Sequence, residues 1–218
     1  MPFQAILFDL DGTLIDSLAD LSNACNRILA ARGYPTHDQD AYRYFIGDGV
    51  KNLLLRALPP QARIEPIVTE CTEAYKAEYA QAWDVHTHAY PGIAELLATA
   101  SAAGMRLAVL SNKPDTFTHQ CVEKFLAGHH FDLVLGASVR FPHKPDPAAA
   151  LHIAAEMNLR PDQFLYLGDT ATDMQTAVAA GMYPLGALWG FRTADELRAA
   201  GAKALLNAPG DMSAYWQM

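Results

Sequence analysis

Short, nearly continuous apolar runs recur along the chain and alternate with longer amphipathic segments. The first run, residues 5–9 (AILFD), is typical of a strand that is buried on both faces of a parallel sheet. Similar runs, the last of them weaker, predict further strands at residues 106–112, 131–137, 164–169, 183–190 and 202–207. The segments between them have helical spacing, several end in Gly or Asn, and they lie at residues 92–104, 114–128, 145–158 and 172–181. This alternation predicts an α/β fold with a doubly wound parallel sheet.

One long interval departs from the alternation. Between the first strand and the helix that begins at residue 92, the pattern is helical and contains no convincing strand. The predicted helices of this interval lie at residues 17–33, 37–45, 49–58 and 64–83. We therefore expect an α/β domain formed by residues 1–16 and 84–218, with a helical subdomain, residues 17–83, inserted after the first strand.

Composition and charge exclude several classes of protein. The 218 residues are 51% hydrophobic and 18% charged, which is typical of a globular chain and unlike a disordered one. Twenty-four Asp and Glu residues against sixteen Lys and Arg residues give a formal net charge of −8, the reverse of a general nucleic-acid binder. No apolar run approaches the length of a membrane span, and the N-terminus lacks the pattern of a secretory signal. We expect neither nucleic acid nor a membrane as partner.

The cysteines indicate the compartment. Cys25, Cys71 and Cys121 are odd in number and widely spaced, which argues against a disulfide framework and against a thiolate zinc site. A reducing, cytoplasmic location is the expectation. The sequence leaves a monomer and a homodimer equally open.

Polar side chains gather where the predicted strands end. They are Asp9 and Asp11 after the first strand, Ser111, Asn112 and Lys113 after the second, Asp169 and Asp173 after the strand at 164–169, and Lys144 in HKPDP (143–147). Because ligands of open α/β sheets bind beyond the carboxyl ends of the strands, we expect these residues to meet at one edge. Asp9 and Asp11 repel each other unless positive charge lies between them. No Lys or Arg occurs from Met1 to Asn26, so the charge must come from a distant segment, a metal, or both.

These residue types suit phosphoryl transfer. Asp9, Asp11 and Asp169 offer oxygen ligands to a hard cation, and Mg²⁺ prefers a few carboxylates together with water and substrate phosphate. Ser111 precedes a predicted helix, where a hydroxyl, backbone N–H groups and the helix dipole stabilise a phosphate oxygen, and Lys144 adds a positive charge. Two neighbouring carboxylates can divide the work: one attacks phosphorus, and the other protonates the leaving oxygen and later activates water.

The motifs resemble those of a known family. DLDGTL (9–14) is similar to the Asp-x-Asp-Gly-Thr signature of the haloacid dehalogenase superfamily, and Ser111, Lys144 in KPDP and GDTATD (168–173) follow in that family's order. All four elements match, so the resemblance covers nearly the whole chain. It implies a Rossmann-like core with a helical cap, like that of the subgroup that contains phosphoglycolate phosphatase.

The resemblance also implies roles for these residues. Asp9 would be the nucleophile and Asp11 the acid and base. The Asp9 carboxylate, the Asp11 backbone carbonyl and Asp169 would bind Mg²⁺. Ser111, Asn112 and Lys144 would bind the phosphoryl group. Asp173 would hold a metal-bound water or the Lys144 ammonium.

The inserted subdomain offers one further candidate site. Gly47 and Gly49 permit close approach of the backbone to a ligand, and Lys51 follows them. Gly49 and Lys51 are therefore candidates for substrate contact from the cap. A plain helix N-terminus with a solvated lysine is an equally good interpretation.

The leading hypothesis is a Mg²⁺-dependent phosphatase that acts on a small phosphorylated metabolite, with 2-phosphoglycolate as the first expectation. A sugar-phosphate mutase, or a phosphatase for another small ester or for pyrophosphate, would use the same core motifs. A signalling receiver domain shares the acceptor aspartate, the metal, the hydroxyl and the lysine, but Asp11 and the helical insertion argue against it. A dehalogenase needs no metal, so Asp11 and Asp169 argue against that reaction.

Overall fold

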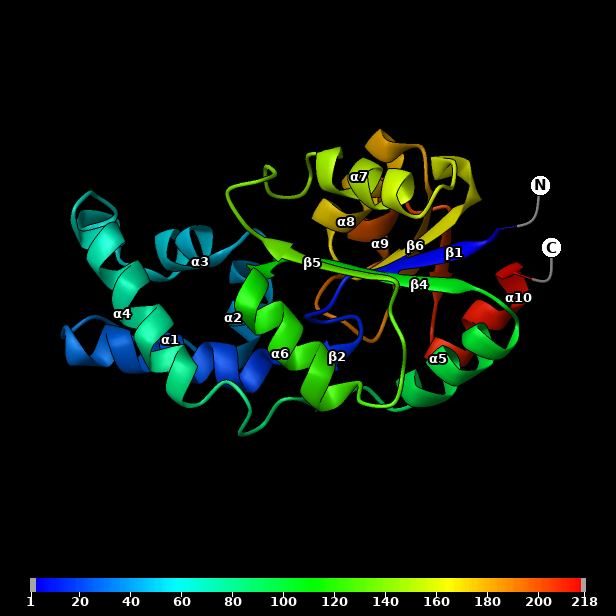
Figure 1. The fold of residues 1–218 in the computed structure, drawn as a ribbon. Coiled ribbons are helices and arrows are strands. Elements are labelled where there is room, and N and C mark those ends of the chain that lie inside the picture. Colours follow the sequence, from blue (N-terminus) through cyan, green and yellow to red (C-terminus); the bar gives the residue numbers. More distant parts are fainter. Residues whose placement is uncertain (1–2, 217–218) are drawn as a thin grey trace. The chain divides into compact units, whose positions relative to one another are not determined.

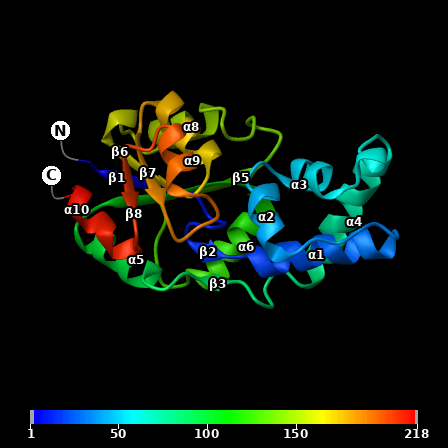
Figure 2. The same ribbon diagram turned by 180° about the vertical axis from the view of Figure 1, so that it is seen from behind.

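The parallel sheet expected from the apolar runs is present. The computed structural model describes residues 3–216 of the chain. Its main sheet has six strands in the order β5-β4-β1-β6-β7-β8, and every neighbouring pair is parallel (Figures 1 and 2). The strands are β1 (Ala5–Phe8), β4 (Arg106–Pro114), β5 (Leu133–Ala137), β6 (Phe164–Gly168), β7 (Tyr183–Ala187) and β8 (Ala204–Leu206). The predicted fold class is confirmed.

Helices cover both faces of this sheet. Figure 1 shows one layer above it, made of α7 (Ala148–Glu156), α8 (Ala171–Ala180) and α9 (Ala194–Ala199). The layer below it is made of α5 (Ile93–Ala102), α6 (Asp115–Phe125) and α10 (Ser213–Trp216). Two 3₁₀ turns, Pro161–Gln163 and Pro209–Met212, complete this unit, which comprises Met1–Ile15 and Ala89–Met218.

The sheet is buried because its strands are apolar on both sides. On the side of α7 and α8, Leu7 of the central strand packs with Leu110 of β4 and Phe164 of β6 in one core cluster. The residues between them, such as Ile6 and Phe8, point to the opposite face, since side chains alternate along a strand, and they are fully buried as well. Each such side chain contributes about 1.5–3 kcal/mol through its burial. This packing fixes the carboxyl ends of β1, β4 and β6 beside one another.

The second unit, Asp16–His88, is helical. It contains α1 (Leu18–Ala31), α2 (Gln39–Phe45), α3 (Val50–Ala57), a 3₁₀ turn (Pro60–Ala62) and α4 (Ile67–Gln81). Within it, the buried Asp20 carboxylate accepts hydrogen bonds from the His86 and Thr87 N–H groups and from Thr87 Oγ1, at 2.7–3.1 Å. These bonds tie the start of α1 to the segment by which the chain leaves the unit.

Short elements differ from the prediction. The interval expected to lack strands contains β2 (Ile15–Asp16) and β3 (His88–Ala89), which form a separate two-stranded sheet. Two residues leave no periodicity in a sequence, so such strands were not predictable. The helix expected from residue 145 begins at Ala148, because Pro145 and Pro147 interrupt its first turn and Asp146 Oδ1 accepts the Ala148 N–H.

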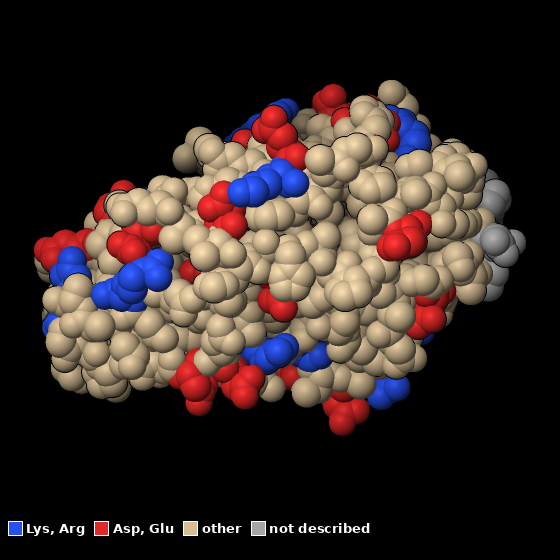
Figure 3. Space-filling model, turned by 90° about the horizontal axis from the view of Figure 1, so that it is seen from below, with Lys and Arg blue, Asp and Glu red and all other residues tan. Residues whose placement is uncertain are grey.

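Other features of the chain follow its composition. Cys25, Cys71 and Cys121 are buried thiols without a disulfide. Among residues 3–216, no helix has the length and apolarity needed to cross a bilayer. Figure 3 shows one face on which Lys and Arg side chains are scattered among Asp and Glu side chains over a mostly uncharged surface.

Candidate active site

Strand register brings the predicted site residues to one edge of the sheet. Phe8 pairs with Val109 of β4 and with Leu167 of β6, and the N–H of Asp9 donates to the Leu167 carbonyl at 2.9 Å. The residues that follow these strands therefore lie next to one another. They include Asp9 after β1 and Asp169 after β6, and Ser111 and Asn112 lie beside them in the C-terminal part of β4.

Lys144 connects two of the carboxylates. Its ammonium donates to Asp9 Oδ1 at 2.8 Å, to Asp173 Oδ1 at 2.6 Å and to the Leu110 carbonyl at 3.0 Å. The side chain is only 2% exposed. Burial alone lowers the pKa of Lys144, but the Asp173 and Asp9 carboxylates outweigh burial and hold this pKa well above its usual value. Lys144 is therefore a permanent cation between the two acids.

Local sequence fixes Asp173 beside this lysine. Thr170 and Asp173 form a capping box at the start of α8, in which Asp173 Oδ2 accepts from the Thr170 N–H at 3.0 Å and from Thr170 Oγ1 at 2.6 Å. The other oxygen, Oδ1, accepts from Lys144. The box thus sets the position of Lys144 as well as the beginning of the helix.

Asp169 is held from two sides. Its Oδ1 accepts from Thr13 Oγ1 at 2.9 Å, and its Oδ2 accepts from the Phe191 N–H at 2.7 Å. Burial raises the pKa of Asp169 to about 7, the Asp173 charge adds to that rise, and the Phe191 and Thr13 hydrogen bonds oppose it. The carboxylate is oriented, but its negative charge is poorly compensated.

The loop after β7 packs against Asp169 and the residues that follow β1. Trp189 Nε1 donates to the Thr13 carbonyl at 2.9 Å. A Cβ atom on Gly190 would lie 2.3 Å from Asp169 Cβ and 2.4 Å from the Gly12 carbonyl oxygen, so only glycine fits there. The run 183–190 was predicted as one strand, but β7 ends at Ala187. Leu188 still donates its N–H to the Leu206 carbonyl of β8 at 2.9 Å, and the chain then turns so that Gly190 lies against Asp169.

The acidic cluster fits a divalent cation. Oxygen atoms of Asp9, Asp169 and Asp173 lie within 4.8 Å of one another, and all three residues are buried. Burial and the Asp173 charge raise the pKa of Asp9 well above its usual value, against the opposing effect of Lys144. Three buried carboxylates with one ammonium leave a surplus of negative charge, which a hard cation with oxygen ligands such as Mg²⁺ would neutralise.

Three further predicted residues occupy the same edge. The Asp11 carboxylate, 13% exposed, accepts a hydrogen bond from Lys113 Nζ at 2.9 Å. Ser111 is buried, and its Oγ accepts from the Lys113 N–H at 3.2 Å. The Asn112 side chain accepts from the Lys144 N–H at 2.9 Å and donates to the Lys144 carbonyl at 3.1 Å. Asn112 thereby fixes the backbone from which the Lys144 side chain extends.

The two candidates in the inserted segment belong to the helical unit. Gly49, with a φ of 86°, is the N-cap of α3. The Lys51 ammonium pairs with Glu65 at 2.9 Å, and the Lys51 side chain is 65% exposed. Substrate contact by either residue stays a prediction.

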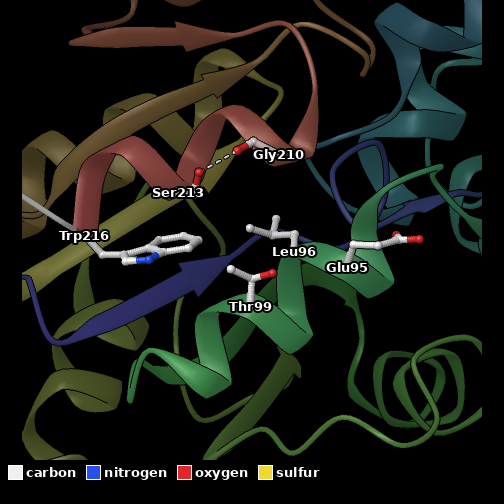
Figure 4. Close-up of a pocket in the computed structure, with 6 residues that line it drawn as sticks. All are labelled: Glu95, Leu96, Thr99, Gly210, Ser213 and Trp216. Atoms are coloured by element: carbon white, nitrogen blue, oxygen red, sulfur yellow. Dashed lines mark hydrogen bonds between the residues drawn. The ribbon is translucent and has the colours of Figure 1, made fainter.

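A separate small cavity lies away from the acidic cluster. It has a volume of about 110 Å³ and lies between α5 and the C-terminal turns (Figure 4). Its lining residues are Glu95, Leu96, Thr99, Gly210, Ser213 and Trp216. Ser213 Oγ donates to the Gly210 carbonyl at 3.0 Å, and the Glu95 side chain extends away from the Trp216 ring. None of the residues at the sheet edge lines this cavity, so it is not the candidate active site.

Comparison with known proteins identifies the family. The family model described as haloacid dehalogenase-like hydrolase matches residues 6–187. The chain belongs to this family. It is 34% identical over 192 residues to a phosphoglycolate phosphatase of Pseudomonas putida, covering 86% of this chain and 70% of the relative. It is 32% identical over 199 residues to a phosphoglycolate phosphatase of Colwellia psychrerythraea, covering 89% and 88% of the two chains.

Solved structures agree with this assignment. A haloacid dehalogenase-like family hydrolase of Streptococcus pneumoniae superposes with a TM-score of 0.89 and 26% identity, covering 99% of each chain. The chain is therefore a hydrolase of this family, which confirms the resemblance drawn from its motifs. The family and the names of the relatives support the conclusion that the chain is a phosphoric monoester hydrolase.

The pKa of Asp169 leads to a prediction about stability. Asp169 binds its proton more tightly in the folded protein, where its pKa is about 7, than in the unfolded chain, where it is 3.8. Its contribution to stability is therefore complete below pH 3.8 and is lost as the pH rises through about 7. Between pH 5 and pH 8, the metal-free protein should lose on the order of 2–4 kcal/mol of unfolding free energy. Urea unfolding of the protein in the presence of chelator, at pH 5 and at pH 8, measures this loss.

Two variants separate this contribution from the other ionisations. Asp169→Asn should flatten the pH dependence of the unfolding free energy, whereas Asp195→Asn, whose side chain is 97% exposed, should leave it unchanged. Saturating Mg²⁺ should restore stability at pH 8, because a ligand that binds the folded state stabilises it. A metal-free wild-type protein that becomes more stable from pH 5 to pH 8 would contradict this account.

Proposed function

We propose that this protein is a Mg²⁺-dependent phosphatase that hydrolyses a small phosphorylated metabolite, with 2-phosphoglycolate as its substrate, in the cytoplasm. The observation that carries the proposal is the buried set of Asp9, Lys144, Asp173 and Asp169, with Asp11 two residues beyond Asp9. The Asp9 carboxylate lies inside this cluster, beside Lys144, and the Asp11 carboxylate lies at its margin. Such an arrangement suits covalent phosphoryl transfer.

The first step uses both aspartates. A carboxylate oxygen of Asp9 attacks phosphorus, the bond between phosphorus and the ester oxygen breaks, and Asp11 gives its proton to the leaving oxygen. In the second step, Asp11 takes a proton from water, and that water attacks the phosphorus of the aspartyl-phosphate. The bond to Asp9 then breaks, inorganic phosphate leaves, and both side chains return to their starting states.

The surrounding groups hold the phosphoryl group and its charge. Ser111, the Asn112 backbone and Lys144 bind phosphoryl oxygens in this proposal, because they lie at the same strand ends as Asp9. The Asp9 carboxylate, the Asp11 carbonyl and Asp169 would hold Mg²⁺, while Asp173 keeps Lys144 in place. When bound, Mg²⁺ neutralises charge on the transferring group.

The helical unit acts as the cap in this proposal. Residues 17–83 would cover the sheet edge during the reaction, exclude bulk water and select the leaving group. Gly49 and Lys51 are the proposed points of substrate contact. The substrate itself is proposed from the two relatives described above, both of which are named phosphoglycolate phosphatases and match most of the chain.

Phosphate release from a panel of esters tests this function. The panel contains 2-phosphoglycolate, hexose phosphates, nucleotides and pyrophosphate, each with Mg²⁺ and with excess chelator. We expect the highest kcat/KM for 2-phosphoglycolate, and loss of at least about 10³-fold in chelator because the carboxylate cluster stays uncompensated. Undiminished hydrolysis in chelator would refute the metal requirement. Interconversion of sugar-phosphate isomers without phosphate release would point to a mutase instead.

A further inference from the structure

The indole of Trp189 is linked to the acidic cluster through Thr13. Trp189 Nε1 donates to the Thr13 carbonyl at 2.9 Å, and Thr13 Oγ1 donates to Asp169 Oδ1 at 2.9 Å. Trp189 lies in the loop after β7, whereas Thr13 lies in the turn after β1, so its hydrogen bond joins two segments that are far apart in the sequence. Trp189 is partly buried, and Thr13 and Asp169 are fully buried.

The same two segments enclose the Asp169 carboxylate. A Cβ atom on Gly12 would lie 2.3 Å from Asp169 Oδ2, and one on Gly190 would lie 2.5 Å from the same oxygen. The backbone therefore approaches this carboxylate closely from both segments. The Phe191 N–H donates to Oδ2 at 2.7 Å. The orientation of the carboxylate thus depends on how the turn after β1 and the loop after β7 are held relative to each other.

These hydrogen bonds leave Asp169 able to bind a cation. Oδ1 accepts from Thr13 and Oδ2 accepts from Phe191, and each carboxylate oxygen has a second lone pair. A ligand whose hydrogen-bond partners fix its orientation binds a metal more tightly, because less ordering remains to be done when the ion binds. Mg²⁺ is sensitive to such ordering, since it demands near-ideal octahedral geometry.

We propose that Trp189 is a positioning residue for the metal site: its indole holds the Thr13 carbonyl, keeps the Thr13 hydroxyl on Asp169 and thereby raises the affinity for Mg²⁺. The inference rests on the proposed function, because it assumes that Asp169 binds Mg²⁺. It adds a residue that acts on the metal through another side chain, and it assigns a role to the loop between β7 and α9.

Calorimetric titration of the metal-free protein with Mg²⁺ at pH 8, without substrate, tests the proposal. Trp189→Phe removes the N–H but keeps an aromatic ring, and it should weaken Mg²⁺ binding about 10-fold. Thr13→Val removes the hydroxyl with little change in size, and it should weaken Mg²⁺ binding about 10- to 100-fold. Trp216→Phe, in the cavity away from the acidic cluster, should bind Mg²⁺ as the wild type does.

The double variant distinguishes a route through Thr13 from any other. If Trp189 acts through the Thr13 hydroxyl, adding Trp189→Phe to Thr13→Val should weaken Mg²⁺ binding by less than about twofold, since the effects of coupled residues are not additive. Saturating Mg²⁺ should also restore the phosphate release that Trp189→Phe loses at low Mg²⁺. Trp189→Leu, which also lacks a donor, takes the place of Trp189→Phe should that variant not fold.

Three results would overturn the role of Trp189 and leave the proposed function standing. They are wild-type Mg²⁺ affinity in Trp189→Phe, an undiminished effect of Trp189→Phe in the Thr13→Val background, and phosphate release by Trp189→Phe that stays low at saturating Mg²⁺. A wild-type protein that binds no Mg²⁺ would refute the metal requirement of the proposed function together with this role.

Discussion

Asp9→Asn should lower kcat by about 10⁴-fold or more, because the amide cannot attack phosphorus to form an aspartyl-phosphate. The variant should still fold. Lys144 keeps its hydrogen bonds to Asp173 and to the Leu110 carbonyl, and the amide is almost the same size as the carboxylate. Steady-state phosphate release from 2-phosphoglycolate, together with thermal unfolding, measures both effects.

Two controls make this result decisive. Mass spectrometry must show that the variant has not deamidated to the wild-type residue, since a trace of Asp9 would mimic residual activity. Asp162→Asn removes a carboxylate that is 64% exposed and paired with Arg160, and it should retain wild-type kcat. Near-wild-type turnover by undeamidated Asp9→Asn would exclude Asp9 as the nucleophile.

Lys144→Met should damage both stability and activity. It removes the cation that Asp9 and Asp173 share, and it leaves two carboxylates buried without a partner of opposite charge. Breaking a buried ion pair in this way typically destabilises a protein by about 3–5 kcal/mol. We expect a loss of this size in urea unfolding of the metal-free protein, and a fall in kcat/KM of about 10³-fold.

Addition of Mg²⁺ to Lys144→Met and a control variant at a surface lysine test the role of Lys144. Mg²⁺ should recover part of the lost stability of Lys144→Met, because it supplies positive charge to the same carboxylates. Lys76→Met removes a lysine that is 48% exposed and pairs with Glu73. It should change neither the unfolding free energy nor kcat/KM appreciably. A Lys144→Met protein with wild-type stability and wild-type kcat/KM would mean that this lysine does not neutralise the site.

Long elements were predictable from the sequence because their patterns are unambiguous. The continuous apolar runs identified all six strands of the main sheet, since strands that are covered on both faces of a parallel sheet are rich in apolar residues. Several short elements, among them β2, β3 and α9, were not identified. The helix α9 went unrecognised because it has only six residues, although Thr193 and Glu196 form a capping box that could have indicated its start.

The site was partly predictable for a different reason. The carboxyl ends of parallel strands meet at one edge, so the residues that follow β1, β4 and β6 had to be neighbours. Pairing between individual side chains depends on rotamers and loop paths that no periodicity records. The bond from Lys113 to Asp11 and the bond from the Phe191 N–H to Asp169 therefore became apparent only in three dimensions.

Capture of the covalent intermediate tests the central claim most directly. The protein is mixed with ³²P-labelled 2-phosphoglycolate and Mg²⁺ and quenched in acid within one turnover, and the peptides are then separated. We expect label on Asp9 in the wild type and none in Asp9→Asn. In Asp11→Asn, which lacks the acid for the first step and the base for the second, the label should both appear and disappear more slowly. Continued hydrolysis by the wild type, with no label on Asp9 at any time, would contradict the account.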